Sequence, residues 1–283
     1  MNVNLQPQTL EIKDWLNNAT SQLSGIGIIS SRLDAEIILS HSLGKNRTYL
    51  HAHGDNLINE NIIKNSNKKL VQRLNRMPIA YIIGYKEFYG RNFIVNKNTL
   101  IPRPESEDII TILGQLLPPT TYHLPPTKLI DVGTGCGCLG ITAKLEFSNL
   151  DVTLSDISKK SLVVTKINAK NLLADVQIVQ NDLLKNYNCK FDFIIANLPY
   201  VDKSWVRSPE TNYEPSLSLF ATDHGLSQIK KLILNIHNSL NPGGYLIIES
   251  DPVQHDLIIK SAEKQLLIKT YQNNYILAFK LRS

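Results

Sequence analysis

The sequence is poor in cysteine, methionine and tryptophan, and it has no long apolar run. Its 283 residues include three cysteines, two methionines and two tryptophans. Cys136, Cys138 and Cys189 are odd in number, which argues against a disulfide framework. No run of about eighteen apolar residues is present, as a membrane-spanning helix would need. The first four residues lack the basic-then-apolar start of a secretory signal, so we expect a cytoplasmic protein.

Metal-binding motifs and internal repeats are also missing. Cys136-x-Cys138 is the one cysteine pair with close spacing, and it has no histidine partners nearby. Two such residues are more typical of a small-residue loop than of a zinc site, so no metal is expected. The residues around 114–127 contain several prolines and predict a surface loop.

The excess of positive over negative charge lies in the first part of the chain. Residues 1–105 hold 13 Lys and Arg against 8 Asp and Glu, whereas residues 106–283 hold 17 of each. Helical patterning at residues 10–18, 31–43 and 58–76 predicts a small helical bundle over residues 1–76. Residues 77–105 predict a linker with a β-hairpin, whose turn lies at 89–92.

Glycines gather in one segment between a predicted strand at 128–132 and a predicted helix at 139–147. Glycine lets the backbone approach a ligand closely, and a helix start offers free N–H groups. The pattern G-x-G-x-x-G from Gly135 fits a dinucleotide fingerprint. The pattern D-x-G-x-G-x-G from Asp131 resembles the first motif of S-adenosylmethionine-dependent methyltransferases. Both interpretations stay open on this segment alone.

Two predicted strands after the glycines end in an acid. Residues 151–156 end in Asp156, and residues 176–182 end in Asp182. A carboxylate at such a strand end can accept both hydroxyls of an adenosine ribose, and Asp182 with Leu183 could line the adenine. Either acid could instead cap a helix or lie in a solvated loop.

Further strands favour the methyltransferase interpretation. They are predicted at residues 244–249, 267–270 and 275–279, and the residues 242–244 before them predict a turn. A closing pair of strands after a helix fits the seven-stranded methyltransferase sheet better than a nicotinamide-binding domain.

The tetrapeptide Asn197-Leu198-Pro199-Tyr200 follows an apolar run at 191–196 that predicts a buried parallel strand. Open α/β folds bind ligands at the carboxyl ends of such strands. There the Asn197 side-chain oxygen and the Leu198 carbonyl could accept the two hydrogens of a planar NH2 group, while Tyr200 packs on it. The alternative is a simple strand-ending turn.

Several segments match one family in order. They are IAYIIGYKEFYG at 79–90, LIPRPESE at 100–107, YEPSL at 213–217 and DHGL at 223–226. On these residues the chain resembles the HemK/PrmC family of protein-glutamine methyltransferases, from roughly residue 79 to the end. The family usually has Asn-Pro-Pro-Tyr, so Leu198 is a departure. Pro199 still favours an extended residue 198, and the leucine keeps its carbonyl acceptor.

The resemblance implies an α/β class I fold, Rossmann-like with seven strands, and a small N-terminal helical domain. It implies release factor recognition by residues 1–76, a linker at 77–105 and a methyltransferase domain at 106–283. The implied reaction moves a methyl group from S-adenosyl-L-methionine to the glutamine amide nitrogen in the Gly-Gly-Gln motif of class 1 peptide chain release factors. The expected catalytic residues are Asn197, Leu198, Pro199 and Tyr200. The expected cofactor-binding residues are Asp131, Gly133, Thr134, Gly135, Cys136, Gly137, Asp156, Asp182, Leu183 and Asn197.

Two other substrates stay open. Asn-Leu-Pro-Tyr also resembles the tetrapeptide of ribosomal RNA adenine dimethyltransferases, and a basic N-terminal part suits nucleic acid. Lys203, Trp205 and Arg207 follow the tetrapeptide and could contact bases and phosphates. A ribosomal-protein glutamine methyltransferase shares the tetrapeptide, although its linker usually differs from residues 100–107. Failure to turn over any substrate despite tight cofactor binding would instead indicate a non-catalytic binding module.

Overall fold

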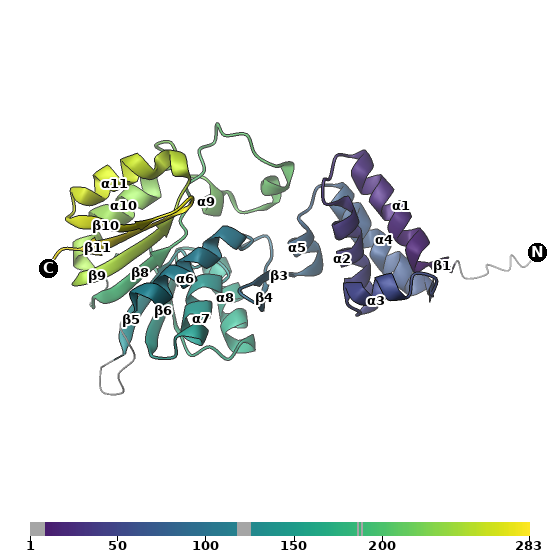
Figure 1. Cartoon of the computed structure of the whole chain (residues 1–283), viewed down its shortest axis with the longest axis horizontal. Coiled ribbons are helices and arrows are strands. Elements are labelled where there is room, and N and C mark those ends of the chain that lie inside the picture. The colour runs from purple at the N-terminus through teal and green to yellow at the C-terminus, as the bar shows by residue number, and fades with distance from the viewer. Residues whose placement is uncertain (1–8, 118–125, 186, 188) are drawn as a thin grey trace, which may run out of the picture. The chain divides into compact units, whose positions relative to one another are not determined.

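A computed structural model describes residues 9–117, 126–185, 187 and 189–283 (Figure 1). The chain divides into two compact units. The helical unit comprises the chain up to Gly84 together with Ser208–Tyr213, and the sheet unit comprises Tyr85–Arg207 and Glu214–Ser283. Each unit has its own apolar core.

The helical unit is a bundle closed by a short antiparallel pair, β1 (Leu10–Glu11) with β2 (Leu57–Ile58). Its helices are α1 (Ile12–Gly25), α2 (Ser31–Leu43), α3 (Arg47–Ala52), α4 (Glu60–Leu74) and α5 (Ile79–Ile83). The predicted bounds of α2 are confirmed, and Gly44 ends it with φ 64°. The predicted start of α4 at Ile58 is wrong. Asn59 caps the helix by accepting from Ile62 N at 3.0 Å, which leaves Ile58 to β2.

A buried arginine connects three segments of the helical unit. Arg73 Nε donates to Asp34 Oδ2 at 2.7 Å, and its NH1 donates to Glu210 Oε1 at 3.0 Å. Glu210 lies in η2 (Pro209–Tyr213), a segment remote in sequence from the helices. Burial alone would raise the pKa of Glu210, but the Ser208 hydroxyl and the Arg73 and Arg76 guanidiniums hold it at about 2. The salt bridge therefore fixes η2 to α4 at neutral pH.

The sheet unit begins with the hairpin predicted from the sequence. Strand β3 (Tyr85–Phe88) pairs antiparallel with β4 (Arg91–Ile94). The turn is only Tyr89 and Gly90, both with positive φ, which matches the twist of the strands. Residues 91 and 92 were predicted in the turn but belong to β4.

A seven-stranded sheet forms the centre of this unit. Its strands are β5 (Thr127–Val132), β6 (Leu150–Asp156), β7 (Gln177–Gln180), β8 (Phe191–Ala196), β9 (Leu240–Glu249), β10 (Leu267–Gln272) and β11 (Ile276–Leu281). The order is β10-β11-β9-β8-β5-β6-β7. Strand β11 is antiparallel to both neighbours, whereas β5 to β9 are parallel. The predicted closing pair of strands is confirmed.

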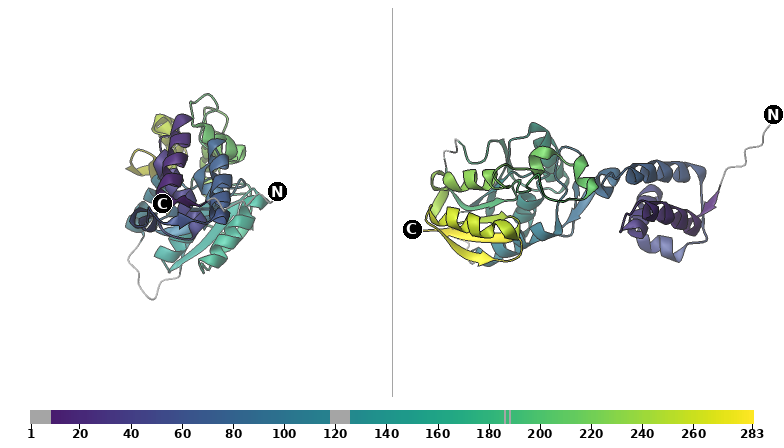
Figure 2. Two further views of the ribbon diagram at one scale, coloured as in Figure 1. Left: turned by 90° about the vertical axis from the view of Figure 1, so that its right-hand side faces the viewer. Right: turned by 90° about the horizontal axis from the view of Figure 1, so that it is seen from above.

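Helices cover both faces of the sheet (Figures 1 and 2). They are α6 (Glu107–Leu116), α7 (Cys138–Glu146), α8 (Lys159–Asn171), α10 (Ser227–Leu234) and α11 (His255–Glu263), with the short α9 (Ser216–Leu219) before α10. This layering buries the apolar strands on both sides.

Two sequence predictions about loops need correction. The loop predicted at residues 114–127 is shortened at its start, because α6 continues to Leu116; residues 118–125 lie outside the described part. The turn predicted at residues 242–244 is wrong, since β9 begins at Leu240 and runs through them. Within the described residues, no helix is both long and apolar enough to cross a membrane.

Candidate active site

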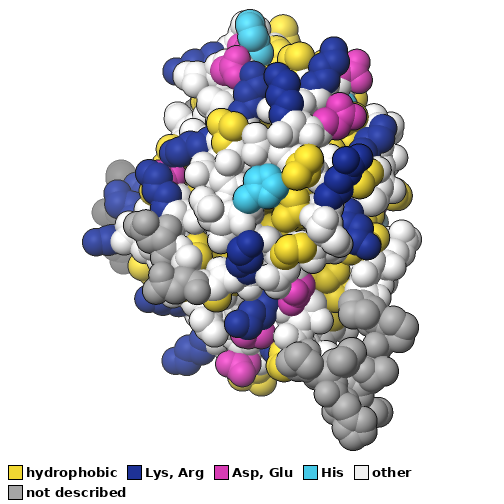
Figure 3. Space-filling model, turned by 90° about the vertical axis from the view of Figure 1, so that its left-hand side faces the viewer, with side chains coloured by type: hydrophobic (Ala, Val, Ile, Leu, Met, Phe, Trp, Pro, Cys, Tyr) yellow, Lys and Arg dark blue, Asp and Glu magenta, His cyan; other side chains and the backbone are white. Residues whose placement is uncertain are grey.

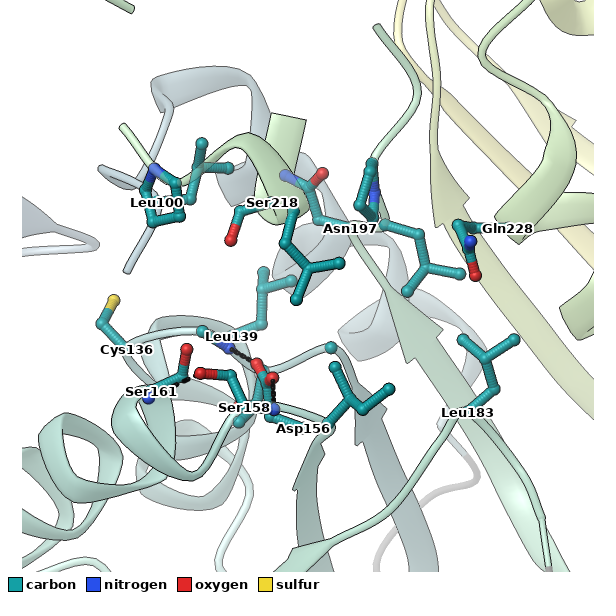
Figure 4. A pocket seen from close by; sticks show the side chains of 18 of the residues that line it. Leu100, Cys136, Leu139, Asp156, Ser158, Ser161, Leu183, Asn197, Ser218 and Gln228 are labelled. Carbon is teal, nitrogen blue, oxygen red and sulfur yellow. Dashed lines mark hydrogen bonds between the residues drawn. The ribbon is translucent and has the colours of Figure 1, made fainter. Parts of the chain in front are cut away.

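A cavity of about 280 Å³ lies at the carboxyl edge of the sheet (Figure 4). Strands β5 and β8 are neighbours there, and the strand order reverses between them, which is where open α/β sheets bind ligands. Its volume is near the lower end of the roughly 300–1,000 Å³ of small-molecule sites. Most of the site residues predicted from the sequence line this cavity, namely Gly133, Thr134, Gly135, Cys136, Asp156, Asp182, Leu183, Asn197, Leu198 and Pro199. Asp131, Gly137 and Tyr200 are not in the wall.

Asp131 shapes the glycine loop from behind. Its Oδ2 accepts from Thr134 Oγ1 at 2.5 Å and from Gly140 N at 3.0 Å, and the residue is fully buried. Burial raises the pKa of this carboxyl to about 6, although both hydrogen bonds oppose the shift. The Asp131 side chain thus fixes the loop, and direct contact with a cofactor stays a prediction.

Glycine is required in the loop for backbone and packing reasons. Gly133, Gly135 and Gly137 have φ of 75°, 59° and 88°, a region that other residues rarely adopt. A Cβ on Gly140 would lie 2.0 Å from Leu154 Cδ2, so this glycine lets α7 pack closely on β6. The loop can therefore present backbone to a ligand in the cavity.

Asp156 lies at the end of β6 and faces the cavity. Its Oδ2 accepts from Gly135 N at 3.0 Å, and its Oδ1 accepts from Ser158 N at 2.8 Å (Figure 4). Burial raises its pKa, against these backbone hydrogen bonds. Each carboxylate oxygen has a second lone pair, so both remain able to accept a ribose hydroxyl.

Asp182 is engaged by two lysines. It accepts from Lys185 Nζ at 2.5 Å and from Lys231 Nζ at 3.1 Å, and the Lys185 hydrogen bond holds its pKa below the usual value. The adjacent Leu183 has φ 55° and also lines the cavity. Contact of Asp182 with an adenine amine stays a prediction, since the lysines compete for the same oxygens.

Asn197 is the first residue of the loop after β8, and a hydrogen bond holds the nitrogen of its side-chain amide. Asn197 Nδ2 donates to Ser106 Oγ at 3.0 Å. Within the described residues Asn197 Oδ1 and the Leu198 carbonyl accept no hydrogen bond, so both acceptors are available to a ligand. Ser106 Oγ in turn donates to Glu249 Oε2.

Tyr200 is fixed at both ends. Its hydroxyl donates to Glu249 Oε1 at 2.9 Å, and its carbonyl accepts from Gln254 Nε2 at 2.8 Å. Burial and the Glu249 carboxylate raise the pKa of Tyr200 well above its usual value, so the hydroxyl stays protonated. A Cβ on Gly225 would lie 2.0 Å from the Tyr200 carbonyl oxygen. This contact explains the glycine in the segment DHGL.

Leu198 joins the tetrapeptide to the glycine loop. It is buried in the apolar core of the sheet unit, and its Cδ2 lies 2.9 Å from where a Cβ of Gly133 would stand. The leucine side chain thus packs directly on the loop.

The segment before α6 contributes to the same cavity. Leu100, Pro102 and Ser106 line it. Glu214 is buried, and its carboxylate accepts from Ile101 N at 3.1 Å and from the Arg103 guanidinium. This ion pair connects the segments LIPRPESE and YEPSL, which the sequence presents far apart.

Sequence reasoning missed several residues of the site. Glu249, behind the tetrapeptide, is one of them, and the missed residues in the cavity wall include Asn98, Ser106, Ser158, Ser161, Ser218, Phe220 and Gln228. Ser106 could have been predicted, because it lies in the segment LIPRPESE that resembles the family. The remaining polar side chains carry no signal of their own in the sequence.

The donor and acceptor set fits S-adenosylmethionine. Asp156 offers carboxylate oxygens suited to a ribose, the positive-φ glycines leave room for close approach, and apolar Leu139 and Leu183 suit an adenine. The described residues contain no group of three or more His, Cys, Asp and Glu side chains able to hold a metal ion. Cys136 and Cys138 are free thiols.

Comparison with known proteins matches both units. The sequence-family model of the PrmC N-terminal domain matches residues 14–84. The family model of the methyltransferase small domain matches residues 110–210. A methyltransferase structure from Pyrococcus furiosus has a TM-score of 0.51 at 18% identity, and covers 77% of this chain and 100% of its own. This likeness shows the fold: an α/β class I methyltransferase sheet.

Curated relatives are more similar. A bifunctional methyltransferase from Rickettsia conorii is 36% identical over 84% of this chain, which spans about half of that protein's length. A release factor glutamine methyltransferase from Koribacter versatilis is 32% identical over 88% of this chain and 91% of its own. The chain therefore belongs to the release factor glutamine methyltransferase family.

Proposed function

We propose that this chain transfers a methyl group from S-adenosyl-L-methionine to the side-chain amide nitrogen of the glutamine in the Gly-Gly-Gln motif of class 1 peptide chain release factors. Relatives that are similar over most of their length are named release factor glutamine methyltransferase. Such a modification would tune translation termination, since the motif acts in peptide release.

The observation that carries the proposal is the pair of free acceptors beside the cavity. Asn197 Nδ2 is tied to Ser106, so Asn197 Oδ1 is the atom left for a ligand. Together with the Leu198 carbonyl it supplies two acceptors, which match the two hydrogens of a primary amide. Tyr200 is rigidly placed at the end of the same loop.

The residues act by orientation and electrostatics. A glutamine amide nitrogen is a weak nucleophile because its lone pair is delocalised into the carbonyl. Two fixed acceptors on its hydrogens hold the nitrogen in one orientation, and they stabilise the positive charge that builds on it. When bound, S-adenosylmethionine supplies an electrophilic methyl group on sulfur. The N–C bond forms as the S–C bond breaks, and the acidic methylated amide loses its proton to water.

The helical unit is proposed to recognise the release factor. It holds nine Lys and Arg against seven Asp and Glu, and most of its lysines are exposed, as on α4. Positive charge speeds encounter with an acidic partner surface. Because release factors act on ribosomes, the reaction is placed in the cytoplasm.

An adenine amine in RNA or DNA is the second candidate, and Leu198 favours it. The loop after the tetrapeptide gives mixed support: Lys203 is exposed, whereas the Arg207 guanidinium lies 4.7 Å from the centre of the Phe220 ring. On the face in Figure 3, Lys and Arg side chains are interspersed with acidic and hydrophobic ones. That face lacks the continuous basic stripe typical of nucleic-acid binding.

A labelled methyl-transfer assay separates the candidates. Wild-type release factor, its loop variant with Gln replaced by Ala, ribosomal proteins and ribosomal RNA are offered in parallel. The proposal predicts label on wild-type release factor alone. Label on ribosomal RNA or a ribosomal protein would contradict it and support the corresponding rival.

A further inference from the structure

A buried hydrogen-bonded chain lies behind the tetrapeptide. Asn197 Nδ2 donates to Ser106 Oγ at 3.0 Å, and Ser106 Oγ donates to Glu249 Oε2. The other carboxylate oxygen, Glu249 Oε1, accepts from the Tyr200 hydroxyl at 2.9 Å. Ser106 is 2% exposed and Glu249 is 1% exposed, so water has little access to the bond between them. One carboxylate therefore connects the first and last residues of the tetrapeptide.

The direction of the hydrogen bonds follows from the number of protons. A serine hydroxyl has one proton and two lone pairs. Ser106 uses its proton on Glu249, so it presents only lone pairs to Asn197. These lone pairs attract the Asn197 NH2 group and repel Oδ1. The Asn197 amide is then fixed with Oδ1 away from Ser106 and free for a ligand.

We propose that Ser106 and Glu249 are positioning residues for methyl transfer: the Glu249 carboxylate, together with the Ser106 hydroxyl, selects the Asn197 amide orientation in which Oδ1 faces the substrate. This role deepens the proposed function and rests on it. Glu249 lies outside the cavity wall, and Ser106 lines the cavity with its only proton donated to Glu249, so both act on the substrate through Asn197. Their effect is to keep an acceptor, and not a second donor, opposite the NH2 group to be methylated.

Replacement of the carboxylate tests this mechanism with little change in shape. In Glu249→Gln the new NH2 group must face Ser106 or Tyr200. If it donates to Ser106 Oγ, the serine proton is released and can turn toward Asn197 Oδ1. The flipped Asn197 amide then points its NH2 group at the substrate NH2 group. Two facing donors lose one hydrogen bond and repel each other.

The first experiment separates kcat from KM. Ser106→Ala and Glu249→Gln are expected to lower kcat for methylation of release factor by about 10- to 100-fold, the range typical of residues that orient a functional side chain from behind. The KM for release factor should stay within about twofold of the wild-type value, and so should the Kd for S-adenosylmethionine measured by calorimetry. The contacts that bind the ground state and the transition state equally are unchanged in these variants. Ser106→Thr retains the hydroxyl and should restore most of kcat.

Ser250→Ala is the matched control. Ser250 adjoins Glu249 and is buried, but its hydroxyl has no hydrogen-bond partner within the described residues. Its kcat should equal that of the wild type. The proposal is overturned if Ser106→Ala keeps wild-type kcat, if Ser250→Ala loses as much as Ser106→Ala, or if Ser106→Thr is as impaired as Ser106→Ala.

A readout without substrate distinguishes failure of this inference from failure of the proposed function. The side-chain NH2 signals of Asn197 in a ¹⁵N spectrum are identified by their loss in Asn197→Asp. Ser106→Ala and Glu249→Gln should shift these signals and speed their exchange with water, while Ser250→Ala should not. No shift in either variant overturns the positioning role. A wild type that orients Asn197 in this way but does not methylate release factor would overturn the proposed function alone.

Discussion

Asn197 is the residue on which the proposed chemistry depends most. We expect Asn197→Ala to lower the rate of methyl transfer by at least about 100-fold, the scale of losing one preorganised electrostatic contact. S-adenosylmethionine binding should remain largely intact, because the glycine loop and Asp156 are unchanged. Single-turnover assays and calorimetry measure the two quantities. Retained turnover in this variant would refute the role assigned to Asn197.

The buried carboxyl of Asp131 should make the stability of the protein depend on pH. Its pKa is raised by burial from 3.8 to about 6 in the folded protein, so between these values the folded state binds more protons than the unfolded state. Its contribution to the free energy of unfolding therefore increases as the pH falls from about 6 toward 4. The difference in unfolding free energy between wild type and Asp131→Asn should follow that trend in urea titrations. A pH-independent difference would contradict the raised pKa.

The close contact between Gly225 and the tetrapeptide holds two segments of the sheet unit together, and a substitution at Gly225 tests it. Gly225 has φ 83°, and a Cβ there would lie 2.0 Å from the Tyr200 carbonyl oxygen and 2.5 Å from Gln254 Nε2. Gly225→Ala must therefore displace the segment before α10 or the loop after β8. We expect lower thermal stability and reduced methyl transfer.

Gly25→Ala serves as the control for that variant. Gly25 ends α1, and a Cβ there meets no atom within 4 Å. Its melting temperature should equal or slightly exceed that of the wild type, because alanine favours a helix more than glycine does, and its activity should be unchanged. A Gly225→Ala protein as stable and active as Gly25→Ala would show that the contact with Tyr200 is unimportant.

Contiguous patterns made the elements around the cavity predictable. The apolar run at β8 predicted its bounds, and the glycine segment predicted the turn before α7. Helices α3 and α5 are short and α6 lies beside a proline-rich segment, so none gave a long periodic signal. The start of β9 was missed because Pro242 and two glycines normally indicate a turn.

The polar network behind the tetrapeptide could not be predicted in the same way. Ser106 and Asn197 are 91 residues apart, and Ser106 and Glu249 are 143 apart. Only the folded sheet unit brings them together. A buried serine or glutamate has no local pattern, so its partner becomes apparent only from the tertiary structure.

At the scale of the whole molecule, the charge of the helical unit is proposed to serve substrate recognition. Lys64 and Lys68 are exposed one turn apart on α4. Reversal of both charges to Glu should raise the KM for release factor by about 10-fold, with kcat and cofactor binding unchanged, since rim charges act mainly on encounter. Added salt should diminish the difference between variant and wild type.

Charge reversal elsewhere controls for net charge. Lys260 and Lys264 are exposed in the sheet unit, at the end of α11 and just after it. The variant with both changed to Glu has the same net charge as the α4 variant and should keep the wild-type KM. Equal increases in KM for the two variants would contradict recognition by the helical unit.

The most direct test of the central claim is mass spectrometry of release factor after incubation with the chain and S-adenosylmethionine. We predict that tandem fragmentation places a single added methyl group on the glutamine of the Gly-Gly-Gln peptide with the wild type, and none with Asn197→Ala. An unmodified glutamine together with a methylated adenine in ribosomal RNA from the same incubation would contradict the account.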